Sequence, residues 1–416
     1  MAKEKIITAI DVGSTKISTI VAALAESKIS VIGVSRVPST GISKGNVVDI
    51  DGAVEAISAS LEKAERMAGV SVSSALVTIN GGHIETKNSH GVVAVSHQGA
   101  EITSDDVARV TEAAQAITLP STRELIHVIP RGFVVDGQDG IRDPVGMSGI
   151  RLEVETNIIH GSATAMRNLV KCVQQVGVDV WDLVYTGVAA SEAILTDTER
   201  ELGTILADIG GGTTSVIMFV DGSPVYSVVL PIGGKHVTND LAIGLRAHMD
   251  AAERIKIKLS DERVGTPHLD VSAGNEEIDV SEYGLDTETI PKRFLYKIIE
   301  TRLEEIFALI ALEVKKANLT GKLPAGVVVT GGSAFTVGME RVAKNVLKSP
   351  VRIGYPKGVT GLIDEIEGPA FAATVGAVIY GSKLLKSKSG LSFDTQKGTI
   401  GNVLSRVLEK AKSFLP

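Results

Sequence analysis

The sequence predicts an α/β protein with two lobes, and three observations support that prediction. Hydrophobic residues make up 44% of the 416 residues and aromatic residues only 4%, so the interior is built from Val, Ile, Leu and Ala, as is typical of sheets covered by helices. A chain of this length exceeds what one hydrophobic core supports. A glycine-rich turn that begins with Asp occurs twice, at residues 11–16 (DVGSTK) and 208–214 (DIGGGTT). We therefore assign one copy of the turn to each lobe.

Each turn is predicted to be the tip of a β-hairpin that binds phosphate. Apolar, β-rich runs flank the turns at residues 6–10 and 17–24, and at 204–207 and 215–220. Glycines let backbone N–H groups converge on an anion, and hydroxyls add donors. The predicted phosphate contacts are Gly13, Ser14, Thr15, Lys16, Gly210, Gly211, Gly212, Thr213 and Thr214. One such turn alone is more often a plain tight turn, but the pair indicates a nucleotide held between the lobes.

Two carboxylates and one glutamate are candidates for the chemistry at the phosphates. Asp11 and Asp208 follow the predicted strands, where they are suited to hold the waters of a Mg²⁺ ion in an outer-sphere role. The alternative is that each caps its turn. Glu192, on a helix predicted at residues 187–195, is a candidate to orient a hydrolytic water. Its alternative is a surface glutamate without a role.

The nucleoside is predicted to lie against the second lobe. Glu253 and Lys256 share one face of a predicted helix, where they can meet the ribose hydroxyls and the base, although an ordinary exposed ion pair is the alternative. Gly331 and Gly332 let the backbone lie against the adenine, an approach that any Cβ would hinder. The predicted nucleotide contacts also include Gly234, Lys235 and Ser333.

The remaining elements are predicted from hydrophobic spacing and capping residues. In the first lobe we expect a strand at 29–37, a helix at 53–67 capped by Asp51, a strand at 75–80, a helix at 163–175 and a strand at 180–185. A β-α-β-β insertion interrupts this lobe, with strands at 91–96, 124–135 and 150–160, a loop between the last two, and a helix at 105–117. In the second lobe we expect strands at 225–231 and 326–330 and helices at 236–245, 250–259, 291–317, 338–347 and 370–384.

These elements divide the chain into eight segments. The first lobe comprises residues 1–81 and 162–202, with the insertion subdomain at 82–161. The second lobe comprises residues 203–234 and 318–385, with an inserted helical subdomain at 235–317. Residues 386–398 are polar and are predicted to form a flexible linker. Residues 399–416 form a separate terminal segment.

The terminal segment is predicted to be an amphipathic helix that binds a membrane surface. Its apolar face is formed chiefly by Ile400, Val403, Leu404, Val407, Leu408, Phe414 and Leu415. Arg406, Lys410 and Lys412 lie on the opposite face against a single acidic residue, Glu409, which suits anionic headgroups. The segment is too short and too polar to span a bilayer. The alternative is a helix that docks on its own domain, and the polar linker argues against it.

Charge and composition exclude several classes of function. The net charge is −7 and no basic run carries interleaved aromatic residues, so we expect no nucleic-acid partner. The N-terminal residues enter a predicted strand without a signal-peptide pattern, and no stretch has the roughly 18 apolar residues of a membrane span. We therefore expect the body of the protein to be cytosolic.

The motifs resemble those of the actin-like ATPase superfamily, through the two turns and an adenosine motif at residues 329–332 (VTGG). Two further motifs, at residues 39–50 (STGISKGNVVDI) and 231–240 (PIGGKHVTND), are similar to the FtsA family of bacterial cell-division proteins, as are the linker and the tail. The resemblance covers essentially the whole chain. It implies an actin-like two-lobed ATPase fold, in which the small insertion replaces one actin subdomain.

The same resemblance implies the cofactors, partners and location. ATP and Mg²⁺ are the expected cofactors, and the expected partners are a second copy in a filament, the tail of the tubulin-like division protein FtsZ, an anionic membrane surface and other division proteins. The expected location is the cytoplasmic face of the cell membrane at the division site. The FtsZ tail docks on the family's equivalent of residues 235–317, where Arg302 matches a basic contact residue. Whether ATP is hydrolysed is left open, with at most a weak ATPase expected.

Two alternatives share the fold. One is an actin-fold pilus assembly protein similar to PilM, and the other is a small-molecule kinase of the same superfamily. The PilM-like proteins share the fold and the insertion but end without a membrane helix. A kinase has no use for the amphipathic tail, and the insertion contains no recognisable substrate motif. The tail therefore favours the cell-division family.

Overall fold

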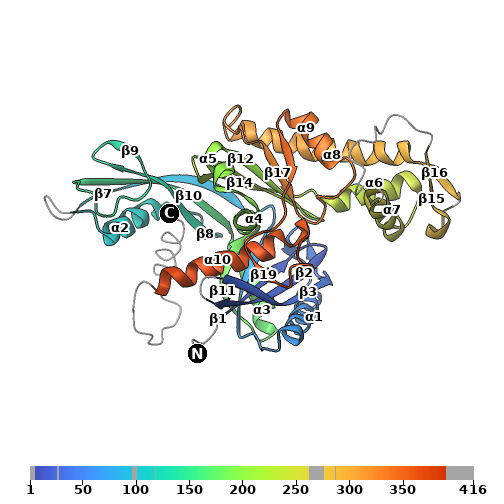
Figure 1. The fold of residues 1–416 in the computed structure, drawn as a ribbon, viewed down its shortest axis with the longest axis horizontal. Coiled ribbons are helices and arrows are strands. Elements are labelled where there is room, and N and C mark those ends of the chain that lie inside the picture. The colour runs from blue at the N-terminus through green and yellow to red at the C-terminus, as the bar shows by residue number, and fades with distance from the viewer. Residues whose placement is uncertain are drawn as a thin grey trace.

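A computed structural model describes residues 5–25, 28–95, 101–117, 119–261, 276–285 and 287–389, and confirms the predicted α/β fold. Two lobes, each built around a sheet, lie beside one another, and a smaller sheet extends from them on one side (Figure 1). The predicted terminal helix at 399–416 and the linker residues from 390 onward lie outside the described residues. In the part of the chain that is described, no helix has both the length and the apolarity to cross a membrane.

The first lobe has a six-stranded sheet with the strand order β11-β6-β1-β2-β3-β19. Its strands are β1 (Lys5–Val12), β2 (Lys16–Ala25), β3 (Lys28–Pro38), β6 (Ser74–Ile79), β11 (Asp179–Tyr185) and β19 (Thr360–Gly361). Strands β1, β2 and β3 are antiparallel, whereas β6 runs parallel to β1. Helix α1 (Ile50–Ala68) packs with α3 (Ala163–Gln175), and α4 (Thr186–Ile194) packs with α10 (Ala372–Ser389).

The second lobe repeats this arrangement in a five-stranded sheet with the order β14-β13-β12-β17-β18. Its strands are β12 (Thr204–Ile209), β13 (Thr214–Val220), β14 (Ser223–Leu230), β17 (Val327–Thr330) and β18 (Val351–Ile353). An antiparallel hairpin, β12–β13, is followed by a parallel neighbour, β17, just as β1–β2 is followed by β6. The repeat places the tips of the two hairpins at equivalent positions in their lobes.

A helical subdomain projects from the second lobe on the side away from the insertion (Figure 1). It contains α6 (Gly234–Leu245), α7 (Met249–Asp261), α8 (Lys292–Lys316) and a small hairpin of β15 (Glu277–Asp279) with β16 (Thr289–Pro291). Helix α9 (Met339–Leu347) packs against α8. The apolar faces of α6, α7 and α8 continue the core of the second lobe.

The insertion is a four-stranded antiparallel sheet covered by one helix. Its strands are β7 (Glu85–Ala94), β8 (Arg123–Val135), β9 (Gln138–Ile141) and β10 (Arg151–Ser162), and its helix is α2 (Ser104–Gln115). Thr103 and Asp106 form the capping box at the start of α2. Strand β9 corrects the predicted loop, because Asp136 and Gly137 adopt positive φ values of 49° and 87° and close a two-residue hairpin.

Three further details differ from the prediction. Asp49, not Asp51, caps α1, because Asp49 has the extended backbone of an N-cap and its side chain accepts from the Asp51 amide at 3.2 Å. A short helix, α5 (Asp197–Leu202), follows α4. Helix α10 continues to Ser389, so residues 386–389, predicted as linker, are helical.

Candidate nucleotide site

The two glycine-rich turns are the tips of hairpins from different lobes, as predicted. Val12 pairs with Ile17 across the first hairpin, and Ile209 pairs with Thr214 across the second. Each turn is closed by the same backbone hydrogen bond: Gly13 N donates to Lys16 O at 3.1 Å, and Gly210 N donates to Thr213 O at 2.9 Å. The two turns therefore have matching backbone geometry.

The turns also contact one another across the lobes. A Cβ added at Gly211 would overlap the Thr15 hydroxyl and lie 2.9 Å from Thr15 Cβ, and one added at Gly212 would lie 2.9 Å from Ser14 Cβ. Lys235 Nζ donates to Ser14 O at 2.9 Å and adds a direct link between the lobes. Only glycine allows the second turn to approach the first this closely.

Helix α6 begins against the second turn. The amides of Gly234 and Lys235 donate to Gly210 O and Gly211 O at 2.9 and 2.8 Å, and the Ser333 hydroxyl donates to Gly210 O at 3.1 Å. The positive end of the α6 dipole thus lies beside the predicted phosphate position, which favours an anion there. These contacts bring Gly234, Lys235 and Ser333 together with the second turn.

Asp11, Asp208 and Lys16 form a charged group at the two turns, in which Asp208 is buried and Asp11 and Lys16 are half-buried. Burial raises the pKa of Asp11, against the opposing effects of Lys16 and of the Thr78 hydroxyl, which donates to Asp11 Oδ1 at 2.6 Å. Burial, and then the negative charge of Asp11, raise the pKa of Asp208 to about 7. Burial lowers the pKa of Lys16 to about 8, and its ammonium donates to the Ala370 carbonyl.

This group fits a hydrated divalent cation. The Asp11 and Asp208 carboxylates, largely withdrawn from solvent, repel each other, and a further positive charge would relieve that repulsion. Mg²⁺ commonly keeps several waters and binds protein through one or two carboxylates. Asp11 and Asp208 therefore suit the predicted outer-sphere role, and the turn-capping alternative does not account for their shared burial.

Glu253 and Lys256 meet at the start of α6. Lys256 Nζ donates to Glu253 Oε2 at 2.7 Å and to Thr238 Oγ1 at 2.9 Å, and lies 3.4 Å from Gly234 O. Lys256 is only 8% exposed although the side chain of Glu253 is 42% exposed, so the pair is half-buried, unlike the fully exposed ion pair of the alternative interpretation. Contact with a ribose or base stays a prediction.

The two glycines after β17 differ in their surroundings. Gly331 has a φ of 93°, and a Cβ there would lie 2.6 Å from Ile209 O, so only glycine fits. At Gly332 a Cβ would meet nothing within 4 Å. Gly331 therefore joins β17 closely to the second turn, and Gly332 leaves space beside it.

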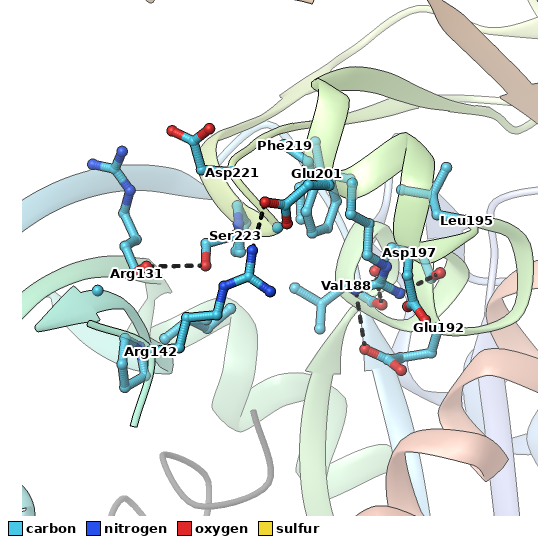
Figure 2. Close-up of a pocket in the computed structure, with 18 of the residues that line it drawn as sticks. Arg131, Arg142, Val188, Glu192, Leu195, Asp197, Glu201, Phe219, Asp221 and Ser223 are labelled. Carbon is cyan, nitrogen blue, oxygen red and sulfur yellow. Dashed lines mark hydrogen bonds and ion pairs between the residues drawn. The ribbon is translucent and has the colours of Figure 1, made fainter. Parts of the chain in front are cut away.

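Glu192 does not belong to this site. It lies in a separate cavity of about 500 Å³, lined by β8, α4, α5, the β13–β14 turn and Lys383 of α10 (Figure 2). Its carboxylate pairs with Lys383 Nζ at 2.5 Å and with Arg200 Nη1 at 3.6 Å, and its side chain is only 2% exposed. None of the residues lining this cavity belongs to either turn. The predicted water-positioning role is therefore wrong, because two cations hold the carboxylate elsewhere.

Two polar residues of the site were not predicted. Thr78 binds Asp11, and Asn80 Nδ2 donates to Thr213 Oγ1 at 3.0 Å. Both lie at the carboxyl end of β6, which runs parallel to β1. The carboxyl ends of neighbouring parallel strands meet at one edge of a sheet, so the position of Thr78 and Asn80 at the end of a predicted strand could have indicated that they belong to the site.

Arg302 lies on α8, away from the two turns. Its Nε and Nη2 donate to the two carboxylate oxygens of Asp240 on α6 at 2.6 and 2.9 Å, and its Nη1 pairs with Glu305. The guanidinium thus joins α6 to α8. Its predicted contact with a partner stays a prediction.

Comparisons with known proteins match both lobes and the insertion. A family model described as "SHS2 domain inserted in FTSA" matches residues 81–160, and one described as "Cell division protein FtsA" matches residues 205–376. The chain is 34% identical to the cell division protein FtsA of Pseudomonas aeruginosa, covering 99% of this chain and 97% of that protein. It is 36% identical to the FtsA of Bacillus subtilis, covering 91% and 84%.

Solved structures show the same fold at lower identity. A "PilM-PilN type IV pilus biogenesis complex" aligns with a TM-score of 0.63 and 14% identity, covering 90% of this chain and 98% of that chain. MreB 5 of Spiroplasma citri bound to AMPPNP aligns with a TM-score of 0.54 and 13% identity, covering 93% and 99%. At these identities the likeness concerns the fold alone, which is the actin-like fold predicted from the motifs.

Proposed function

Because the chain belongs to the FtsA family of cell-division proteins, we propose that it binds ATP between its lobes, forms filaments and anchors FtsZ to the membrane. The membrane face is the cytoplasmic one, at the division site, where other division proteins are further partners. The observation that supports nucleotide binding most directly is the contact between Gly211 and Thr15, which brings two phosphate-binding turns from different lobes together.

The residues of the proposed nucleotide site have separate tasks. The backbone amides of residues 13–15 and 210–214 bind the phosphates, and Lys16 and Lys235 supply positive charge. Asp11 and Asp208 hold the waters of Mg²⁺, which supplies charge neutralisation between the phosphates. The solved structure of MreB 5 with AMPPNP supports the choice of nucleotide, since it has a similar fold.

The rest of the nucleotide and its hydrolysis follow from the same contacts. Glu253 and Lys256 face the ribose and base beside Gly234, and Gly332 leaves room for the adenine. We assign no hydrolytic base, because Glu192 is held in another cavity. The proposal is therefore one of nucleotide binding that controls lobe angle and assembly.

Membrane anchoring rests on the spacing of apolar residues in the tail, which lies outside the described residues. The apolar face has eight side chains, the seven named above and Ala411. Inserting half the area of each into the membrane contributes roughly 1 kcal/mol per side chain, and each basic residue contributes about 1 kcal/mol more. These gains offset the ordering of a helix and leave reversible binding, which a filament strengthens through avidity. The tail has only one aromatic residue, Phe414, so we expect modest affinity for a single copy.

We propose that FtsZ docks on helices α6 and α8. Ile243 and Phe294 are 70% and 47% exposed on these helices. The helices meet at Gly244, where a Cβ would lie 2.7 Å from Ile298 Cδ1. Arg302 and Asp240 supply a charged pair between the same two helices. Apolar side chains around a fixed charge pair suit a short peptide with apolar and charged residues.

Liposome sedimentation tests the proposed function. FtsZ is mixed with liposomes containing anionic lipid, with or without the full-length protein and Mg²⁺-ATP, and the pellet is quantified. FtsZ is expected in the pellet only when the full-length protein is present, and not with a variant lacking residues 399–416. FtsZ that stays in the supernatant with the full-length protein would contradict the anchoring role.

A further inference from the structure

A small hairpin in the segment at residues 39–50 has an unusual residue at its tip. Strand β4 (Ile42–Ser43) pairs with β5 (Asn46–Val47), and Lys44 and Gly45 form the two-residue turn. Both turn residues have positive φ, 47° for Lys44 and 77° for Gly45. Such turns favour Asn-Gly, because in the left-handed region a Cβ crowds the backbone carbonyl, and Asn offsets this cost by local hydrogen bonding whereas Lys does not. Five other described non-glycine residues, Lys348 among them, also have positive φ, so a role for Lys44 depends on what the tip of the hairpin contacts.

The tip of this hairpin contacts the phosphate turns of both lobes. The Gly45 amide donates to Ser14 Oγ at 2.9 Å. A Cβ at Gly212 would lie 3.4 Å from the backbone nitrogen of Lys44. Ser39 at the start of the segment donates its amide to Thr15 O at 3.0 Å. The tip of the hairpin thus lies beside both turns, where they contact one another.

The charged residues around the two turns would neutralise a bound phosphate chain only in part. Asp11 and Asp208 balance Lys16 and Lys235 in formal charge, and Arg36 is one further cation close enough to act on Lys16, whereas a triphosphate with Mg²⁺ retains about two negative charges. Lys44 is exposed, and no residue in the described ranges forms an ion pair with it. Its ammonium is therefore available to a phosphate as a point charge.

We propose that Lys44 binds the terminal phosphate of a bound nucleoside triphosphate, so that the hairpin at residues 42–47 distinguishes a triphosphate from a diphosphate. This inference rests on the proposed nucleotide site. A diphosphate lacks the group that Lys44 binds, and its affinity depends on the two glycine-rich turns instead. The tip of the hairpin contacts both lobes, and the phosphate would hold that tip through Lys44. Loss of the terminal phosphate would therefore weaken the contact between the two lobes.

The test measures two affinities in the full-length protein. Fluorescence titration with labelled ATP and labelled ADP, each with Mg²⁺, compares the wild type with Lys44→Asn, which removes the charge and suits the turn. Lys348→Asn is the matched control, since Lys348 is also exposed, has a φ of 51° and lies at the end of α9. Lys44→Asn is expected to weaken ATP binding about tenfold, or about 1.4 kcal/mol, and ADP binding less than twofold. Lys348→Asn is expected to change neither.

The outcomes separate this inference from the proposed function. If the wild type binds both nucleotides and Lys44→Asn weakens both equally or neither, only the role of Lys44 is overturned. If the wild type binds neither nucleotide, the nucleotide site fails and the inference fails with it. Lys44→Arg keeps the charge and is expected to retain the preference for ATP.

Thermal unfolding without nucleotide adds a readout that does not depend on binding. Lys44→Asn relieves the strain in the turn, so its unfolding midpoint is expected to equal or exceed that of the wild type by roughly 1 °C. Adding ATP is expected to raise the unfolding midpoint of the wild type more than that of Lys44→Asn. A lower midpoint for the variant without nucleotide would show that the lysine supports the fold, and would overturn the inference.

Discussion

Replacing Gly211 with alanine is expected to weaken nucleotide binding by forcing the two lobes apart. The added Cβ would overlap the Thr15 hydroxyl and lie 2.9 Å from Thr15 Cβ, whereas ordinary contacts of a Cβ are 3.4–4 Å. One of the turns must therefore shift by more than about 0.5 Å, and overpacking of this kind costs ~1–3 kcal/mol. Because the turns belong to different lobes, the shift separates the amides that converge on the phosphates. We expect the affinity for Mg²⁺-ATP to fall by roughly 5- to 150-fold.

Fluorescence titration of wild-type and variant protein with a labelled ATP measures this loss. Gly132→Ala in β8 is the control, since a Cβ there would meet only Ile141 O at 4.0 Å. Thr15→Ala removes the overlapping hydroxyl, so the double variant Gly211→Ala/Thr15→Ala is expected to recover part of the affinity lost by Gly211→Ala. Unchanged affinity in Gly211→Ala, or losses that simply add in the double variant, would refute the contact between the turns.

Three further predictions follow from the charges and the tail. Asp208→Asn is expected to stabilise the nucleotide-free protein against urea unfolding at pH 8 but not at pH 5. Burial and the charge of Asp11 raise the pKa of Asp208 to about 7, so the folded state holds an extra proton between pH ~4 and 7. The wild type therefore loses stability as the pH rises through that range. An equal change at both pH values would count against this buried charge. Deletion of residues 399–416 is expected to abolish liposome co-sedimentation while ATP binding persists, and unchanged sedimentation would exclude the tail as the anchor. Glu192→Gln is expected to lower the free energy of unfolding by about 2 kcal/mol, because Lys383 and Arg200 lose their shared carboxylate. The affinity for ATP is expected to stay unchanged, and a fall in that affinity would show that Glu192 acts at the nucleotide site.

The fold was predictable where local signals agree with one another. The two hairpins, the capping box at Thr103 and the helix at 163–175 each have apolar spacing and end signals that indicate the same element. Strand β9 was missed although Asp136-Gly137 is a strong hairpin signal, because the short and polar β9 has no alternating apolar pattern. Local reasoning thus favoured a loop.

The sequence predicted those residues of the site whose place is set by the local backbone, such as the glycines of the turns, and not those placed by packing between distant segments. Gly211 and Gly212 are required by the close approach of the lobes, whereas Gly13 and Gly210 are required by the tightness of their own turns, which the sequence repeats. Glu192 was misplaced because its spacing from Asp208 gives no direction for its side chain. Its partner Lys383 lies 191 residues away on α10, and no local pattern reveals that packing. The role of Asn80 likewise depends on β6 lying parallel to β1.

A crystal structure with Mg²⁺ and a non-hydrolysable ATP analogue would test the central claim most directly. The account predicts density for the triphosphate between the two turns, within hydrogen-bond distance of amides from residues 13–15 and 210–214, with the Mg²⁺ waters facing Asp11 and Asp208. An analogue bound by only one turn, or in the cavity around Glu192, would contradict it.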